Sequence, residues 1–175
     1  RFVVRKLRAL PMPVVCAVNG IAAGAGANIA LACDIVLAAR SAKFLQAFAK
    51  IALIPDSGGT WFLPRLAGDA RARGMALLGE PLPAETAEAW GMIWKCVDDA
   101  ALMETAHALC AKFAEAPTGA LAAIKSALDA AATNSLDAQL DLERDVQQRL
   151  GRAYDYNEGV AAFMEKRAPR FRGRG

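Results

Sequence analysis

The stretch LIPDSGGTWFLPRL, residues 53–66, places one carboxylate among apolar residues and glycines. Asp56 follows Pro55 and precedes the pair Gly58 and Gly59, where an amphipathic helix is expected to begin. Aspartate is a favoured N-cap residue, so a helix cap is the plainest interpretation. Desolvation among apolar neighbours would instead disfavour the charged form and suit the carboxyl group to proton transfer. The local residues leave both interpretations open.

A second candidate is the small-residue turn NGIAAGAGAN, residues 19–28, which is expected to lead from a strand into a helix. Gly24 and Gly26 permit close approach of the backbone to a ligand, and Ala25 between them adds little bulk. The N–H groups at a helix start have no partner within the helix, so they can stabilise negative charge on an oxygen. The turn lacks the Lys-Ser/Thr of a P-loop and does not match GxGxxG. Tight packing between helix and strand is the other reason for such glycines, and this alternative also stays open.

Composition and isolated residues exclude several classes of site. The chain has 175 residues, 55% hydrophobic and 22% charged, with a net charge of +3, which is typical of a folded domain and predicts no nucleic-acid partner. The single histidine, His107, has no evident serine or cysteine partner, which disfavours catalytic triads and histidine-based metal sites. The four cysteines form no CxxC pair, so they are expected to be small buried thiols in a reducing, cytoplasmic compartment. No apolar run approaches the roughly 20 residues that span a bilayer.

The apolar patterns predict an α/β region followed by helices. Buried strands are expected at residues 13–18, 34–39 and 92–97, with a short one near residues 43–44, while residues 45–55 could be loop or short helix. Helices are expected at residues 1–10, 24–33, 60–66, 69–80, 84–91, 98–117, 118–135, 135–155 and from 157 onward. The composition shifts near residue 100, which predicts an α/β part with the active site over 1–100 and a helical oligomerisation part over 101–175. Apolar helix faces with little sheet beside them favour a partner subunit.

Several segments together resemble the crotonase, or enoyl-CoA hydratase/isomerase, superfamily. The first are PMPVVCAVNGIAAGAGANIALACDIVLAARSAKF and IALIPDSGGTWFLPRLAG, and the resemblance continues through GMALLGEPLPAETAEAWGMI to FMEKRAPRF. Each piece is weak, but their order is specific. The resemblance implies a crotonase (ClpP-like) spiral of ββα turns with a C-terminal helical trimerisation region, assembled as a homotrimer or hexamer. It also implies an acyl-CoA substrate, no metal and no cofactor beyond the coenzyme A of the substrate.

The same resemblance assigns roles to residues. The Ala25 N–H would hold the thioester oxygen as an enolate forms. The family's second backbone N–H donor belongs to an earlier strand–helix turn that has no match here. The N-terminal third, which would carry this second donor, is therefore expected to be missing from this sequence. Hydratases of the family carry two glutamates, where this chain has Asn28 and Phe48. An aspartate directly after IP is similar to the family's isomerases, which move a proton with one carboxylate. The resemblance therefore implies that Asp56 is catalytic.

A narrower resemblance is to family isomerases that convert ring-1,2-epoxyphenylacetyl-CoA into its oxepin isomer in bacterial phenylacetate degradation. It is carried by SAKFLQAFAKIALIPDSGGTWFLPRLAG, ALLGEPLPAETAEAWGMIW and TNSLDAQLDLERDVQQ. It implies that the glycines of the turn, with Phe48 and Trp61, shape an apolar pocket. It also implies that Phe163 and Lys166 reach the CoA nucleotide, of the same subunit or across a subunit boundary; surface packing is the alternative for this last pair. A Δ3,Δ2-enoyl-CoA isomerase, an enoyl-CoA hydratase of fatty-acid oxidation and an inactive structural fragment remain alternatives.

Overall fold

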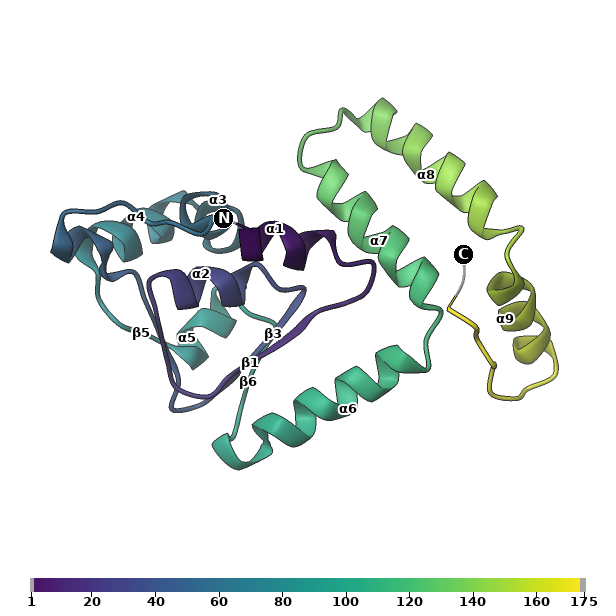
Figure 1. The fold of residues 1–175 in the computed structure, drawn as a ribbon, viewed down its shortest axis with the longest axis horizontal. Helices are drawn as coiled ribbons and strands as arrows, with labels where there is room; N and C mark the ends of the chain where they lie inside the picture. The colour runs from purple at the N-terminus through teal and green to yellow at the C-terminus, as the bar shows by residue number, and fades with distance from the viewer. Residues whose placement is uncertain (1, 174–175) are drawn as a thin grey trace. The chain divides into compact units, whose positions relative to one another are not determined.

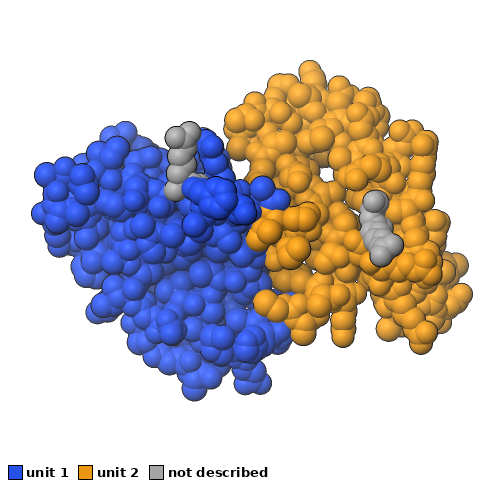
Figure 2. Space-filling view, in the orientation of Figure 1, with its two compact units in different colours: residues 1–9, 14–109 blue, residues 10–13, 110–175 orange. Residues whose placement is uncertain are grey.

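A computed structural model describes residues 2–173, which form two compact units (Figure 2). The first unit contains the chain up to Ala9 together with Val14–Leu109. The second contains Leu10–Pro13 and the chain from Cys110 onward. The sequence predicts that the active-site part ends and the oligomerisation part begins near residue 100. This functional division stays a prediction, because two compact units show how the chain packs and not what each part does.

The first unit holds the strands and the shorter helices (Figure 1). Its strands are β1 (Val15–Val18), β2 (Ile21–Ala23), β3 (Ile35–Ala39), β4 (Lys43–Leu45), β5 (Leu82–Pro83) and β6 (Lys95–Val97). Its helices are α1 (Phe2–Ala9), α2 (Ala25–Leu31), α3 (Gly59–Ala67), α4 (Asp69–Leu78) and α5 (Ala84–Ala89), with the 3₁₀ turns η1 (Ala47–Ile51) and η2 (Asp99–Ala101). Helix α6 (Leu102–Ala114) contributes residues to both units.

The strands form two small sheets that repeat one pattern. One sheet has the order β1-β3-β6 with both pairs parallel; the other has the order β2-β4-β5, with β2 and β4 parallel and β5 antiparallel. Val15 pairs with Ile35 in the first sheet, and Ile21 pairs with Lys43 in the second. Two successive strand–strand–helix turns are therefore stacked in parallel, as in the predicted ββα spiral.

Small and apolar residues let these layers pack closely. Phe44, Leu37 and Leu63 are at most 1% exposed, and burying a side chain of this size stabilises the fold by roughly 1.5–3 kcal/mol. Helix α2 buries Ala27 and Ala30, whose short side chains allow its backbone to lie close to its neighbours. This close packing holds the start of α2 in place against the strands.

Two strands differ from the sequence-based expectation. β2 lies inside the stretch expected to be a turn, because its pairing with β4 supplies the backbone hydrogen bonds that its small residues do not signal locally. β5, only two residues long, lies in a segment expected only to end a helix. The ambiguous residues 45–55 contain η1.

The second unit contains α7 (Thr118–Ala131), α8 (Leu136–Leu150) and α9 (Tyr154–Met164). Helices α7 and α8 are neighbours joined by a short turn, and Ser135 caps α8 by accepting a 3.2 Å hydrogen bond from the Ala138 N–H. This capped hairpin of helices agrees with the predicted helical C-terminal region.

The chain beyond α9, residues 165–173, is fixed to that helix by two carboxylates. Asp155 is 8% exposed and accepts hydrogen bonds from the N–H groups of Arg172 and Gly173, at 2.7 and 2.9 Å. Glu158 accepts two from the Arg167 guanidinium, at 2.6 and 3.0 Å, and one from the Arg170 N–H at 2.7 Å. These contacts, chiefly that of Arg167, lower the pKa of Glu158 to about 2.

All four cysteines are free thiols, but they are not all buried as expected. Cys16, Cys33 and Cys96 are half-buried, and Cys110 is exposed. Cys110 continues the face of α6 that buries Leu102 and Ala106, but it lies one residue past the end of the first unit. The core that covers this face therefore stops before Cys110.

Candidate active site

The predicted small-residue turn lies at the start of α2. Gly24 has φ +52°, a left-handed conformation that suits glycine, and its N–H donates to the Leu45 carbonyl at 2.8 Å. A Cβ at Gly24 would lie 3.3 Å from Cζ of Phe48, so the Phe48 ring packs directly on the turn. A Cβ at Gly26, by contrast, would meet nothing within 4 Å. Packing thus explains Gly24, while the backbone at Gly26 faces open space.

Ala25 is the first residue of α2. The helix begins with the Asn28 N–H donating to the Gly24 carbonyl at 3.1 Å. N–H groups in the first turn that precede this bond have no acceptor within the helix. The Ala25 N–H is therefore available to an oxygen that develops negative charge.

Asn28, one helical turn after Ala25, links α2 to the turn that carries Asp56. It is 0% exposed, and its Nδ2 donates to the Asp56 carbonyl at 2.9 Å. Its Oδ1 accepts a 2.8 Å hydrogen bond from Nε2 of Gln46, which is also 0% exposed. The structure thus links the backbone of the Asp56 turn to α2 at a residue one helical turn from Ala25. The sequence interpretation named Asn28 only as a missing acid and missed its role in this link, as it missed Gln46.

Neither local interpretation of Asp56 holds as stated. The N-cap of α3 is Gly58, with φ +87°, so Asp56 lies two residues before the cap and does not cap the helix. Its side chain is exposed rather than desolvated, and the flanking Leu53 and Ile54 are 59% and 79% exposed. The helix start is delayed by Ser57 and Gly58, which both have left-handed backbone conformations, with φ +49° and +87°. Within residues 2–173 the Asp56 carboxylate makes no hydrogen bond or ion pair.

Trp61 lies on α3, just after this turn. It is 43% exposed, its ring packs edge-on against Phe62 with centroids 5.0 Å apart, and the Arg65 guanidinium lies 4.1 Å from its ring centroid. Phe62 in turn lies under Gly58, where a Cβ would approach its ring to 2.7 Å. Trp61 is therefore connected to the Asp56 turn through Phe62.

The two residues predicted to reach the CoA nucleotide belong to the second unit. Phe163, near the end of α9, is 82% exposed, and Lys166, just after that helix, is exposed with φ +54°. Their contact with CoA stays a prediction.

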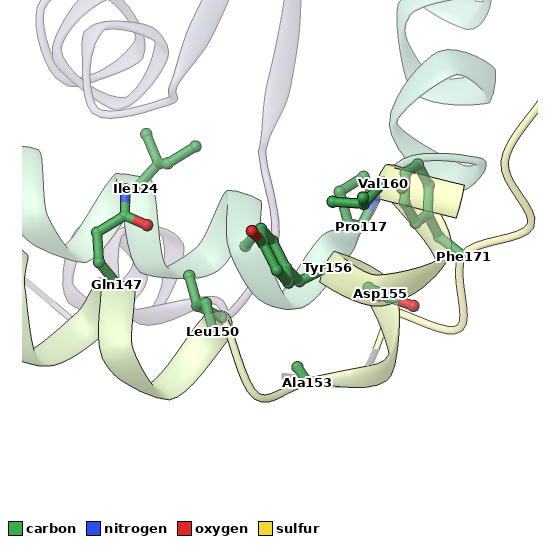
Figure 3. Close-up of a pocket in the computed structure, with 11 residues that line it drawn as sticks. Pro117, Ile124, Gln147, Leu150, Ala153, Asp155, Tyr156, Val160 and Phe171 are labelled. Atoms are coloured by element: carbon green, nitrogen blue, oxygen red, sulfur yellow. The ribbon is translucent and has the colours of Figure 1, made fainter. Parts of the chain in front are cut away.

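The second unit also has a cavity of about 380 Å³ between its helices and the terminal segment. Figure 3 shows Ile124 of α7, Leu150 of α8 and Tyr156 of α9 around it. Neither Phe163 nor Lys166 lines this cavity, so it is separate from the predicted CoA contacts.

Two further searches bear on the kind of site. No three His, Cys, Asp or Glu side chains between residues 2 and 173 gather closely enough to hold a metal ion. None of the helices described in this range is long and apolar enough to cross a membrane.

Comparison with known proteins gives a consistent result. The sequence pattern of the enoyl-CoA hydratase/isomerase family matches residues 3–174. The chain is 61% identical over 171 residues to the 1,2-epoxyphenylacetyl-CoA isomerase of Escherichia coli (strain K12), covering 98% of this chain and 65% of that protein. It is 54% identical over 164 residues to a "Probable enoyl-CoA hydratase" of Rhodobacter capsulatus, and the match covers 94% of this chain and 64% of that protein.

A solved structure of similar fold is an enoyl-CoA hydratase from Polaromonas sp. JS666, with a TM-score of 0.93, 36% sequence identity and coverage of 97% of this chain and 66% of that one. The chain thus spans about 65% of the length of the curated relatives it matches. The match over nearly every residue, the identities above 30% and the shared crotonase fold agree with one another. The chain belongs to the enoyl-CoA hydratase/isomerase family.

Proposed function

We propose that the full-length protein is an acyl-CoA isomerase in which Asp56 carries the proton. The observation that supports this most is the arrangement around Asn28. Asn28 and Phe48 stand where the resemblance places the two glutamates of hydratases, and neither can act as an acid or base. The Asp56 turn is hydrogen-bonded at 2.9 Å to Asn28, which lies one helical turn after Ala25 on α2.

The proposed chemistry is a transfer of one proton between two carbons of the acyl group. The Asp56 carboxylate removes a proton beside the thioester carbonyl, and the Ala25 N–H stabilises the negative charge on the thioester oxygen of the enolate. The protonated Asp56 then returns the proton at another carbon, so that the composition of the substrate does not change. One carboxylate is sufficient for this cycle, whereas hydration by the family's route uses two.

For the substrate, we favour a ring-1,2-epoxyphenylacetyl-CoA that is converted to its oxepin isomer in phenylacetate degradation. The ring carbon–carbon bond that the epoxide bridges opens, with its electron pair passing into the double bonds of the seven-membered ring, and the proton transfer then moves one double bond next to the thioester. The 61% identical relative named for this substrate supports that choice, as does the apolar Phe48 ring packed on the turn. Trp61 would border the same acyl pocket, and Phe163 and Lys166 would contact the CoA nucleotide. We further propose a homotrimer or hexamer in the bacterial cytoplasm.

Asp56→Asn in the full-length protein tests the proton carrier. We expect turnover to fall by roughly 10²–10⁴-fold, the usual contribution of a general acid or base, while the affinity for acyl-CoA changes by less than about twofold. Steady-state kinetics and calorimetric titration with a non-reactive acyl-CoA measure the two quantities. Asp69→Asn is the matched control, because Asp69 is an exposed aspartate paired with Arg73 on α4, and it should leave both unchanged. Normal turnover in Asp56→Asn would mean that another group moves the proton.

The second candidate is an enoyl-CoA hydratase, which the 54% identical relative named as a probable hydratase favours, or else a Δ3,Δ2-enoyl-CoA isomerase of linear acyl chains. Incubation of the full-length protein with ring-epoxide, 3-enoyl and 2-enoyl thioesters of CoA separates the candidates by product mass and structure. We expect rearrangement without a change in mass, fastest for the ring-epoxide. Addition of water, or a preference for straight chains, would overturn the substrate assignment. Absence of turnover on every substrate would favour a purely structural role.

A further inference from the structure

Two buried side-chain amides connect three segments of the first unit. Asn28 belongs to α2, and Gln46 lies between β4 and η1. Both are 0% exposed, so each amide has lost its contact with water and needs hydrogen-bond partners inside the protein. The third segment is the turn of Asp56, whose carbonyl accepts from Asn28.

The order of donors and acceptors along this chain of amides is fixed. A backbone carbonyl can only accept, so Asn28 must direct its Nδ2 at Asp56 and its Oδ1 at Gln46. Gln46 must then present its NH₂ group to Asn28. A rotation of either amide by half a turn would place two oxygens or two NH₂ groups against each other. The Asp56 carbonyl therefore sets the orientation of Asn28, and the Gln46 NH₂ group supplies the donor that Oδ1 of Asn28 needs in that orientation.

The other half of Gln46 shows which of its groups matters. Within residues 2–173, Oε1 of Gln46 is buried without a hydrogen-bond partner. The group that it uses is the NH₂ that holds Asn28.

The turn that Asn28 holds is strained and closely packed. Ser57 has φ +49°, a left-handed conformation that is unfavourable for a residue with a side chain. The Asp56 carbonyl also accepts a 2.8 Å hydrogen bond from the Gly59 N–H, and a Cβ at Gly59 would lie 2.4 Å from Nδ2 of Asn28. Such a turn keeps one conformation only if its surroundings hold it there.

We propose that Gln46 and Asn28 are positioning residues for the proton carrier. Gln46 donates to Oδ1 of Asn28 and so holds this amide in its bond to the Asp56 carbonyl, and the backbone so fixed aims the exposed Asp56 carboxylate at the substrate. The inference rests on the proposed function, because it assigns these two residues to the isomerase reaction of Asp56. It explains why an amide stands on α2 where the resemblance places a hydratase glutamate.

Gln46→Met in the full-length protein removes the donor and keeps a side chain of similar length. We expect kcat to fall about tenfold or more while KM changes less than about twofold, because the carboxylate is misaimed and the CoA contacts are untouched. In the Asp56→Asn background the same substitution should change the residual rate less than about twofold, because nothing remains to be aimed. A general loss of structure would lower the rate by the same factor in both backgrounds.

A readout without substrate complements the kinetics. Amide hydrogen exchange of Gly59, whose N–H donates to the Asp56 carbonyl, should become about tenfold faster in Gln46→Met. Val36→Ala, which shortens a core side chain of β3 that is 5% exposed, is the control: it should lower the melting temperature but leave kcat unchanged.

If Gln46→Met does not fold, Gln46→Glu replaces it. Its buried carboxyl group can donate to Asn28 when protonated but not when ionised, so the pH–rate profile should gain a descending limb. Unchanged kcat and unchanged Gly59 exchange in Gln46→Met, or no added limb in Gln46→Glu, would overturn the positioning role. If Asp56→Asn loses turnover while Gln46→Met leaves kcat unchanged, the positioning role is refuted and the proposed function of Asp56 stands. Full turnover in Asp56→Asn would refute the proposed function itself.

Discussion

Gly59 has no side chain, and this allows Asn28 to make a buried hydrogen bond to the Asp56 carbonyl. The space that a Cβ would take at Gly59 is filled by the Asn28 amide, which therefore lies close enough to bond the Asp56 carbonyl. Nothing near residue 59 in the sequence indicates this, because GG before a helix is equally typical of a simple turn.

We predict that Gly59→Ala destabilises the first unit by about 1–3 kcal/mol, because the new methyl group would overlap the Asn28 amide and push it off its partners. Urea denaturation measures this change. The matched control is Gly74→Ala, in the interior of α4, where a Cβ would meet nothing within 4 Å; it should stabilise the unit by about 0.5–1 kcal/mol. Equal effects of the two substitutions would contradict the close approach at Gly59.

At the scale of elements, the terminal segment after α9 depends on the charge of Glu158. Its pKa in the folded protein is about 2, below the ordinary 4.5, because the Arg167 guanidinium and the Arg170 N–H favour the carboxylate. The stabilisation is therefore fully present above pH 4.5 and is lost as the pH falls toward 2.

We predict that the NMR shift of the Arg170 amide, which donates to Glu158, titrates with a midpoint near 2. Glu158→Gln should abolish this titration and release the segment, as faster amide exchange of Arg170. Glu165→Gln is the control, since its carboxylate also pairs with Arg167 but is 60% exposed, and it should keep the titration. A midpoint near 4.5 would show that the ion pair does not hold the segment in solution.

The sequence predicted those helices and strands that are indicated by the pattern of their own residues. The apolar runs indicated β1 and β3, and helical periodicity indicated the helices after residue 59. β2 was missed because its partner, β4, lies about twenty residues further along the chain. The resemblance named Ala25 and Asp56, but the local reading of Asp56 as a cap or a desolvated acid was wrong, and the Asn28 link could not be seen. A side-chain bond between residues 28 positions apart leaves no periodic pattern.

At the scale of the whole molecule, several large apolar side chains of the second unit are exposed. Leu128 of α7 is 70% exposed, Leu136 and Leu140 of α8 are 73% and 53% exposed, and Phe163 of α9 is 82% exposed. Exposed apolar groups of this size are typical of surfaces that another chain covers. This agrees with the proposed trimer or hexamer.

We predict that the full-length protein sediments as a trimer or hexamer and that Leu128→Glu shifts it toward the monomer, because a charge would be buried in the interface. Analytical ultracentrifugation over a range of concentrations measures this. Ser126→Glu adds the same charge at an exposed position two residues away, on another face of α7, and should preserve the assembly. A monomer at all concentrations would refute the proposed assembly.

The pairing of β3 also has a consequence for how the chain folds. β3 pairs with β1, about twenty residues earlier, and with β6, whose partner residues lie nearly sixty residues later. Because synthesis proceeds from the N-terminus, one edge of β3 stays open until β6 has left the ribosome. Open strand edges pair readily with other chains, and long-range pairing is slow, whereas α7 and α8 are neighbours in sequence and can associate at once. During the interval before β6 arrives, the open edge of β3 therefore exposes this chain to aggregation.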